Sequence, residues 1–337
     1  MVSNYSQAVR GGAAAAARAH RQLGVRERLE TSGGSVNVFA LINELDVPLL
    51  LRPLDGLLGA YLNAPSQGIL VTTQRPMSIQ RFTAAHELGH CLLNHQPSLD
   101  DEASILRRMP ANFDPGHDYQ EVEADAFAVA FLMPKWLLAL HMRRQNWTVP
   151  DFRRANVIYQ FSLRLGVSYE ALCWTLVRYR MIAAKQAREL LQTKPKALKE
   201  ALLADHRPTN YRGDVWLLTE RDAGALIDGS RNDLFVLKLT EHSNGGYLWN
   251  IHQLQESGFA IVSNEIEAIE TDSVGDPGIR RVTAMPPEEY RGRLVLDETR
   301  PWDHNQSFSR LELDLDLTGP EGEGLSRAER RRLLEAA

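Results

Sequence analysis

Cysteine is almost absent from this chain, which has only Cys91 and Cys173 among its 337 residues. Two cysteines cannot form a disulfide framework or a cysteine-rich zinc module. Long apolar runs are also lacking, because no segment approaches the roughly 18 residues that a membrane helix needs. The small-residue stretch at 11–17, flanked by Arg10 and Arg18, makes a poor signal-peptide core. We therefore expect a cytoplasmic, soluble protein with no membrane partner.

A positive charge excess is missing too, since 38 Lys and Arg residues stand against 43 Asp and Glu residues, for a net charge of −5. This balance disfavours a dominant phosphate-binding surface, although it leaves a local basic patch open. The hydrophobic content of 44% is enough for a sizeable core. The length fits about two domains.

Helical patterns dominate the first 204 residues, and strand patterns dominate the rest. Four segments have the composition or apolar spacing of helices: residues 5–23 (an alanine-rich surface helix), 36–45, 78–94 and 120–133. Three short extended runs among them predict a small sheet: residues 49–51, 59–62 and 68–73. After the helical residues 151–204, a linker-like stretch at 205–210 leads into short β-like runs that predict a sandwich. We expect an α+β chain with domains at 1–150, 151–204 and 205–318 and a charged tail at 319–337.

The strongest chemical signal is the motif His86-Glu87-Leu88-Gly89-His90 on the expected helix 78–94. Two histidines four positions apart lie about 40° apart around a helix axis, so both imidazoles can reach one zinc ion. Glu87 lies beside that face and can act as a general base. The alternative is a helix with two surface histidines and an ordinary carboxylate.

A zinc hydrolase needs a third protein ligand. His95 is nine residues after His86, which places it on about the opposite side of a continuous helix. The next helix offers Glu121, Glu123 and Asp125. Glu121 and Asp125 share a face, so one could bind the metal while the other orients a ligating histidine. Glu123 points about 200° away from Glu121, and spacing does not decide which of the two faces the metal. The alternative is a solvated first helical turn.

Residues 36–181 resemble the ImmA/IrrE family of bacterial zinc metallopeptidases. The matching pieces are Arg81-Phe82-Thr83-Ala84-Ala85 with the motif that follows it, and residues 121–128, ending in Leu132-Met133-Pro134. In this family the first Glu of a Glu-x-x-Ala-Asp/Asn motif binds the metal. The resemblance therefore implies a mainly helical zincin-like, gluzincin-type domain in which His86, His90 and Glu121 hold Zn²⁺.

The same resemblance implies a narrow protein substrate, typically a helix-turn-helix repressor that controls stress, mobile-element or phage-defence genes. Residues 159–172 also look like the family's helical segment after the peptidase core, which is reminiscent of helix-turn-helix packing. A DNA-binding regulator is thus a further hypothesis, and it predicts salt-sensitive duplex binding by residues 151–204. The negative net charge disfavours this nucleic-acid partner.

Residues 214–317 resemble chagasin-like domains, which are immunoglobulin-like folds that inhibit papain-type cysteine proteases. Three loops carry the resemblance: residues 244–249, residues 275–278 and Arg300-Pro301-Trp302. The first loop departs from the family, because Ser243-Asn244-Gly245 stands where the family has Pro and Thr. We expect Tyr247, Trp249 and Trp302 to bind a protein, either the substrate or a sensor. Two alternatives are sandwich anchors without a binding role and a protease inhibitor on a peptidase scaffold.

Overall fold

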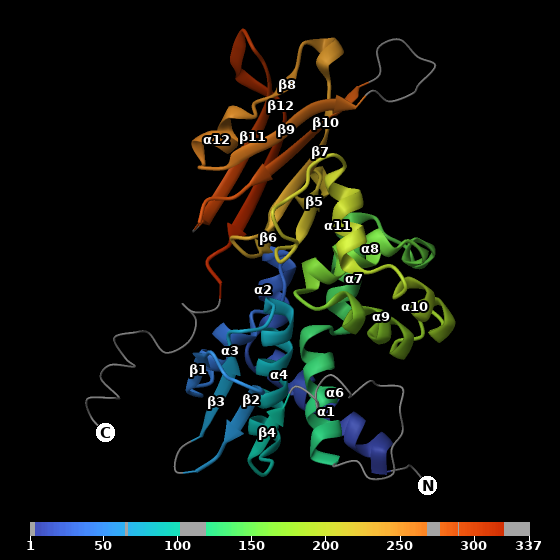
Figure 1. Cartoon of the computed structure of the whole chain (residues 1–337), viewed down its shortest axis with the longest axis vertical. Helices are drawn as coiled ribbons and strands as arrows, with labels where there is room; N and C mark the ends of the chain where they lie inside the picture. The colour runs from blue at the N-terminus through green and yellow to red at the C-terminus, as the bar shows by residue number, and fades with distance from the viewer. Residues whose placement is uncertain (1–3, 65–66, 102–118, 268–276, 289, 320–337) are drawn as a thin grey trace, which may run out of the picture.

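The computed structural model describes residues 4–64, 67–101, 119–267, 277–288 and 290–319. The chain folds into a helical body with a small sheet at one end of the molecule and an all-β domain at the other (Figure 1). The expected α+β class, with an immunoglobulin-like C-terminal domain, is confirmed. The expected charged tail beyond residue 319, and residues 275–276 of the second chagasin-like loop, lie outside the described residues.

The N-terminal helix expected at 5–23 is present, and a second helix that was not expected follows it. Helix α1 (Asn4–Gln22) stops where Gly24 takes a left-handed conformation (φ 59°), and α2 (Val25–Ser32) follows directly. The expectation of a surface helix is wrong for one face of α1, because its small residues are buried against α6 (Tyr119–Leu132). A Cβ on Gly12 would lie 2.1 Å from the carbonyl oxygen of Glu123, so only glycine permits this close approach.

The small sheet carries the two helices with the chemical signal. Its strands are β1 (Leu49–Arg52), β2 (Leu57–Leu62), β3 (Gly68–Thr72) and β4 (Ser98–Asp101), in the order β1-β3-β2-β4. Strand β1 is parallel to β3, and the other pairs are antiparallel. Helix α3 (Val38–Glu44) precedes the sheet, and α4 (Met77–Leu93) packs on β2 and β3. Helix α6 then packs against α4, which brings their side chains together.

The helical extension follows as a series of short helices. They are α7 (Lys135–Gln145), η1 (Val149–Arg153), α8 (Ala155–Leu165), α9 (Tyr169–Arg178), α10 (Ala184–Leu190) and α11 (Pro195–Leu203). Gly166 (φ 67°) ends α8, and the Ser168 hydroxyl accepts from the Ala171 amide at the start of α9. This geometry separates α8 from α9.

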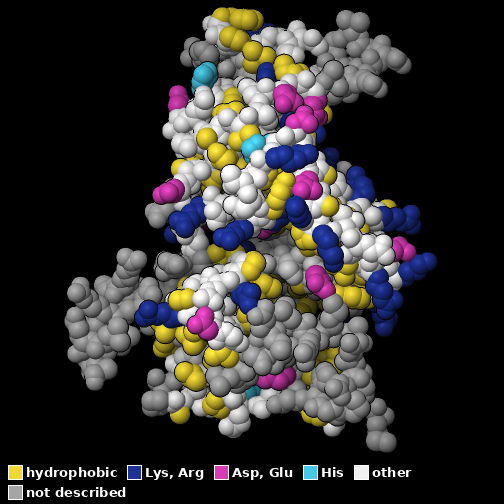
Figure 2. Space-filling model, viewed as in Figure 1, with side chains coloured by type: hydrophobic (Ala, Val, Ile, Leu, Met, Phe, Trp, Pro, Cys, Tyr) yellow, Lys and Arg dark blue, Asp and Glu magenta, His cyan; other side chains and the backbone are white. Residues whose placement is uncertain are grey.

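The extension also carries the local basic patch that the net charge left open. Exposed Arg153, Arg180, Lys185 and Arg188 belong to this part of the chain, and Figure 2 shows Lys and Arg side chains gathered over it. However, α9, the second helix of the helix-turn-helix-like pair, carries exposed Glu170 in its first turn. A carboxylate at that end repels phosphate, which weighs against duplex reading by this helix.

The all-β domain is a sandwich of two four-stranded sheets. One sheet has the order β5-β7-β10-β9 and the other the order β6-β12-β11-β8. The strands are β5 (Val215–Leu218), β6 (Ala225–Asp228), β7 (Leu234–Glu241), β8 (Leu248–Trp249), β9 (Ala260–Glu267), β10 (Gly278–Met285), β11 (Arg291–Arg300) and β12 (Asp303–Asp316). The sequence pattern did not reveal β6, β8 and β10. Strand β8 has only two residues, and β10 carries adjacent arginines. Short helices η2 (Glu220–Asp222), η3 (Ser243–Gly245) and α12 (His252–Glu256) connect the strands.

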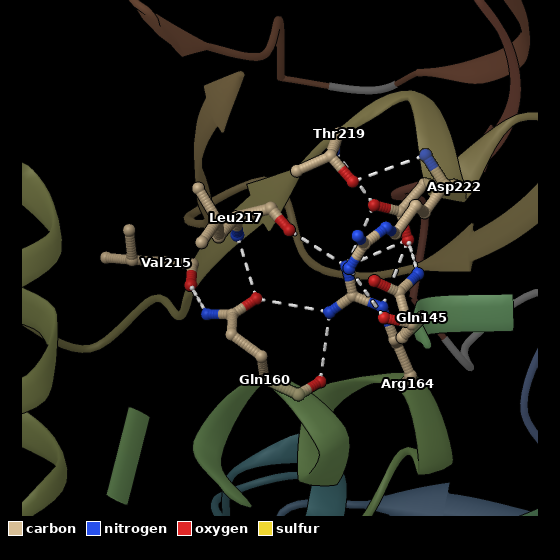
Figure 3. A network of polar contacts seen from close by, with 8 residues as sticks. Gln145, Gln160, Arg164, Val215, Leu217, Thr219 and Asp222 are labelled. Carbon is tan, nitrogen blue, oxygen red and sulfur yellow. Dashed lines mark hydrogen bonds and ion pairs between the residues drawn. The ribbon is translucent and has the colours of Figure 1, made fainter. Parts of the chain in front are cut away.

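The sandwich is docked on the helical extension through a buried junction. Arg164 of α8 and Asp222 of η2 form an ion pair at 2.8 Å, with their side chains 4% and 1% exposed. Gln145 donates to the same carboxylate at 2.7 Å, and Gln160 donates to the Val215 carbonyl (Figure 3). The prediction of a simple linker at 205–210 is therefore incomplete, because side chains on both sides of it lock the two parts together.

A second ion pair joins the two parts at the same junction. Arg81 of α4, 6% exposed, pairs with Asp228 of β6 at 2.6 Å. Cutting the chain near Asp205 would leave Arg81 and Arg164 without their carboxylate partners, so the sandwich is not a dispensable appendage.

None of the helices among the described residues is both long enough and apolar enough to cross a membrane.

Candidate metal centre

Three predicted ligands come together where α4 packs against α6. His86 Nε2 and His90 Nε2 lie 3.0 Å apart on α4. The Glu121 carboxylate of α6 faces both rings, with Oε2 3.3 Å from His86 Nε2 and Oε1 3.6 Å from His90 Nε2. The two histidines are buried and Glu121 is half-buried. Tertiary packing thus selects Glu121, rather than Glu123, as the carboxylate of this group.

The three donors fit a zinc ion. A tetrahedral ion with bonds of about 2.0–2.1 Å holds its ligand atoms about 3.3–3.4 Å apart. The two imidazole nitrogens lie 3.0 Å apart, and each has a different Glu121 oxygen beside it, Oε2 at 3.3 Å from His86 and Oε1 at 3.6 Å from His90, so these separations are close to that value. Two imidazoles and one carboxylate are also a common set in catalytic zinc sites, which leave a position open. The residues present therefore suit Zn²⁺.

Gly89 permits the close contact between α4 and α6. A Cβ at this position would lie 3.1 Å from the Phe127 ring and 3.2 Å from the Ala124 Cα. An added Cβ would require the facing residues of α6 to shift by a few tenths of an ångström, and larger side chains would require more. The glycine inside the motif is therefore part of the geometry of the site.

Asp125 lies behind His86, as the shared face with Glu121 predicts. Its Oδ1 is 2.9 Å from His86 Nδ1, the ring nitrogen that faces away from the other ligands. A carboxylate in this position holds the ring in place and keeps its proton on Nδ1. Nε2 then has a free lone pair for a metal.

Glu87, the expected general base, is fully buried on α4. A Cβ on Gly59 of β2 would lie 2.8 Å from Glu87 Oε1 and 2.4 Å from the Thr83 methyl carbon. The carboxylate therefore lies directly against β2, and glycine at position 59 provides the space for it. Sequence spacing does not connect Gly59 with the motif, because the two meet only through the packing of α4 on the sheet.

His90 has a partner that sequence spacing does not predict. His95 Nδ1 lies 3.0 Å from His90 Nδ1, and His95 Nε2 lies 3.0 Å from Glu123 Oε2. His95 was placed opposite His86 on the assumption that the helix continues through it. In the structure α4 ends at Leu93, and Asn94 takes a left-handed conformation (φ 55°). The chain turns back and places the His95 ring beside His90, where burial lowers the pKa of His95. His95 is not one of the grouped ligands, as expected, but it contacts one of them.

Two of the three aromatic residues expected to bind a partner lie at an exposed tip of the sandwich. Trp302, in the β11–β12 turn, is 73% exposed, and Gly246 (φ 78°) gives its ring room on the neighbouring loop. The Arg300 guanidinium lies 4.5 Å from the centre of the Tyr247 ring. Phe308, which is 53% exposed, packs beside Tyr247 with ring centres 4.8 Å apart and the ring planes tilted by 40°. We call Tyr247, Arg300, Trp302 and Phe308 the aromatic tip.

Trp249 does not belong to this surface. It is 4% exposed, its indole N–H donates to the Thr240 carbonyl at 2.8 Å, and its amide donates to Glu241 at 3.1 Å. These contacts make it an anchor of the sandwich core, so the expectation of a partner-binding Trp249 is corrected.

Comparisons with known proteins match the two parts of the chain separately. Residues 44–177 match the model of the IrrE N-terminal-like domain (Peptidase_M78), and residues 229–316 match that of the chagasin family peptidase inhibitor I42. Amoebiasin-2 of Entamoeba histolytica is 31% identical over 97 residues, which are 28% of this chain and 78% of that protein.

Two solved structures are also similar to part of the chain. The crystal structure of the cysteine protease inhibitor EhICP2 from Entamoeba histolytica is 24% identical and has a TM-score of 0.25. The match covers 31% of this chain and 94% of that one. The solution structure of Amebosin is 18% identical with a TM-score of 0.23, covering 30% of this chain and 96% of that one.

Proposed function

This chain belongs to the IrrE N-terminal-like peptidase family through residues 44–177 and to the chagasin family through residues 229–316, and on that premise we propose that it is a zinc-dependent endopeptidase that cleaves a specific protein partner. One observation carries the proposal: two imidazole nitrogens and a carboxylate converge within 4.8 Å of one another, on the helix that also bears Glu87 and on its neighbour.

The residues have separate tasks in this proposal. His86, His90 and Glu121 would hold the ion, while Asp125 orients His86. When bound, zinc supplies Lewis acidity, which polarises a carbonyl and brings the pKa of a water to about 7. The Glu87 carboxylate takes the proton of the attacking water and returns it to the leaving amine. Its fully buried position against β2 keeps this base in a site of low dielectric constant, where its charge acts strongly.

The substrate that we propose is a helix-turn-helix repressor of stress, mobile-element or defence genes, which is what the family resemblance implies. A cytoplasmic location, proposed with it, agrees with two buried, free cysteines.

The test begins with metal analysis of the full-length chain, followed by incubation with the repressor encoded beside its gene. We expect about one zinc ion per chain and cleavage at a defined bond. Glu87→Gln should slow cleavage by about 100-fold or more without releasing zinc, because the amide keeps the size of the side chain and loses its basicity. Glu189→Gln, the same change at an exposed position of α10, is the matched control. Cleavage by Glu87→Gln at the wild-type rate would refute the mechanism.

The exposed aromatic tip favours a second candidate function for the sandwich, the binding or inhibition of a papain-type cysteine protease. The chagasin match covers both loops of the tip, and exposed aromatic and arginine side chains are common anchors of protein interfaces. Titration of the full-length chain into such a protease tests this function. Tight inhibition that Trp302→Ala abolishes and Glu87→Gln preserves would support it. No inhibition at micromolar concentrations would exclude it.

The tip lies far from the metal centre, which bears on the kind of partner that it binds. Strand β11 begins at Arg291, paired with Asp316 at the junction, and ends at Arg300 in the tip. Its 10 residues span about 30 Å at roughly 3.3 Å per residue. A partner on the tip therefore leaves the metal centre uncovered. We propose that the tip binds a second protein, a sensor or a protease, and docking of the substrate itself is the alternative.

A further inference from the structure

We propose that His95 and Glu123 are positioning residues that fix the tautomer and orientation of His90 for zinc binding. The inference rests on the proposed zinc peptidase function and deepens it, because the motif and the family match assign no role to either residue. Its basis is a line of three polar side chains that starts at a metal-facing imidazole and ends at a carboxylate.

The distances define this line without a gap. His90 directs Nε2 toward His86 and Glu121, and its other nitrogen, Nδ1, lies 3.0 Å from His95 Nδ1. The far nitrogen of His95, Nε2, lies 3.0 Å from Glu123 Oε2. His90 is 1% exposed and His95 is 6% exposed, so water does not readily replace the contact between the two rings, whereas the Glu123 side chain at the end of the line is 30% exposed.

Only one arrangement of protons satisfies every member when a metal occupies the site. A metal-binding His90 is neutral and keeps a lone pair on Nε2, so its proton is on Nδ1. That N–H donates to His95 Nδ1, which must then be the acceptor. Neutral His95 therefore carries its proton on Nε2 and donates a hydrogen bond to the Glu123 carboxylate, which in its ionised form has acceptors but no donor. The carboxylate thus determines the tautomer of His90 through an intervening imidazole.

The backbone holds this line in place at both ends. The left-handed Asn94 turns the chain after α4, and the His95 amide donates to the His90 carbonyl at 3.0 Å. At the other end, α1 packs on Glu123, where a Cβ on Gly11 would lie 2.9 Å from Glu123 Oε1. Helix α1 lies outside the matched region 44–177. The N-terminal helix therefore restrains the carboxylate from a position that the family match does not include.

The two histidine ligands are supported in different ways. His86 meets its carboxylate, Asp125, directly at 2.9 Å. His90 reaches its carboxylate, Glu123, through the intervening imidazole of His95. Loss of the His95 imidazole should therefore deprive His90 of its orienting partner. Such a loss typically weakens metal affinity by about 10–100-fold.

Zinc affinity, measured by competition with a fluorescent chelator, tests the inference without relying on cleavage. We expect His95→Phe to weaken zinc binding by about 10–100-fold. His95→Asn should retain much of the affinity, because the Asn side-chain oxygen can accept from His90 Nδ1–H in place of the ring nitrogen. His20→Phe is the matched control, since His20 is also 6% exposed and packs against Phe131 and Trp136 rather than the ligands. Wild-type zinc affinity in His95→Phe would overturn the proposal.

A second measurement keeps the proposal testable if His95→Phe does not fold. An N–H···N hydrogen bond transmits a scalar coupling between its two nitrogens, so zinc-loaded wild-type protein labelled with ¹⁵N-histidine should show one between His90 Nδ1 and His95 Nδ1. If that coupling is absent but zinc still binds tightly, the inference is overturned and the proposed function stands. A wild-type chain that binds no zinc would overturn the proposed function, and this inference with it.

Discussion

Removal of the Arg164 guanidinium should reveal how firmly the sandwich is joined to the helical extension. In the native chain Asp222 accepts from Arg164 Nε at 3.0 Å, from Gln145 at 2.7 Å and from the Thr219 amide at 2.9 Å. Arg164→Met keeps most of the side-chain volume but leaves Asp222, 1% exposed, with a negative charge and no cation. The Leu217 carbonyl also loses its donor at 2.8 Å.

The expected loss follows from this geometry. Breaking one partner of a buried ion pair costs about 3–5 kcal/mol, because the remaining charge stays in a medium of low dielectric constant. Removing both partners is less costly, so Arg164→Met combined with Asp222→Leu should recover part of the loss. Urea unfolding monitored by tryptophan fluorescence and by circular dichroism measures these differences.

The exposed pair Arg26–Glu30 provides the control for Arg164→Met. Its side chains are 58% and 45% exposed, so Arg26→Met should leave the unfolding midpoint unchanged. A loss below about 1 kcal/mol in Arg164→Met would refute the reasoning, since it would mean that water reaches Asp222 and that the junction is loose. The double variant must also be more stable than Arg164→Met alone, or the charge argument is wrong.

Four further predictions concern the metal centre and the core. Asp125→Ala should weaken zinc affinity by about 10–100-fold in the chelator competition while the circular dichroism spectrum stays unchanged; wild-type affinity would remove Asp125 from the site. Gly59→Ala should displace the Glu87 carboxylate and slow cleavage without loss of zinc, and an unchanged rate would contradict the packing. Gly12→Ala should lower unfolding free energy by about 1–3 kcal/mol, because its Cβ meets backbone, and a gain in stability would refute this. Burial lowers the pKa of His141 to about 3, so the unfolded chain takes up its proton first and stability falls as the pH drops from 6.5 toward 3. His141→Asn should reduce that pH slope by about one proton, and an unchanged slope would refute the assignment.

The sequence by itself determined what depends on local geometry. Two histidines at i and i+4 must share a helix face, so the His86–His90 pair followed from the backbone period of the helix. The same periodicity placed Asp125 beside Glu121, and short β-like runs separated by turn residues indicated the sandwich. Helical spacing did not decide whether Glu121 or Glu123 faces the histidines. That choice needed either the family resemblance or the packing of α6 on α4.

Tertiary structure alone decided the contacts between elements that are distant in sequence. The burial of Trp249, the space that Gly59 leaves for Glu87, and the ion pairs of Arg81 and Arg164 across the junction depend on which surfaces meet. His95 shows the limit of helical periodicity most clearly. Helical spacing would place His95 opposite His86 only if the helix continued to residue 95. The helix ends before that, because Asn94 takes a left-handed conformation. Where a helix stops depends on what its end packs against, which is why the His90–His95–Glu123 line is visible only in the folded chain.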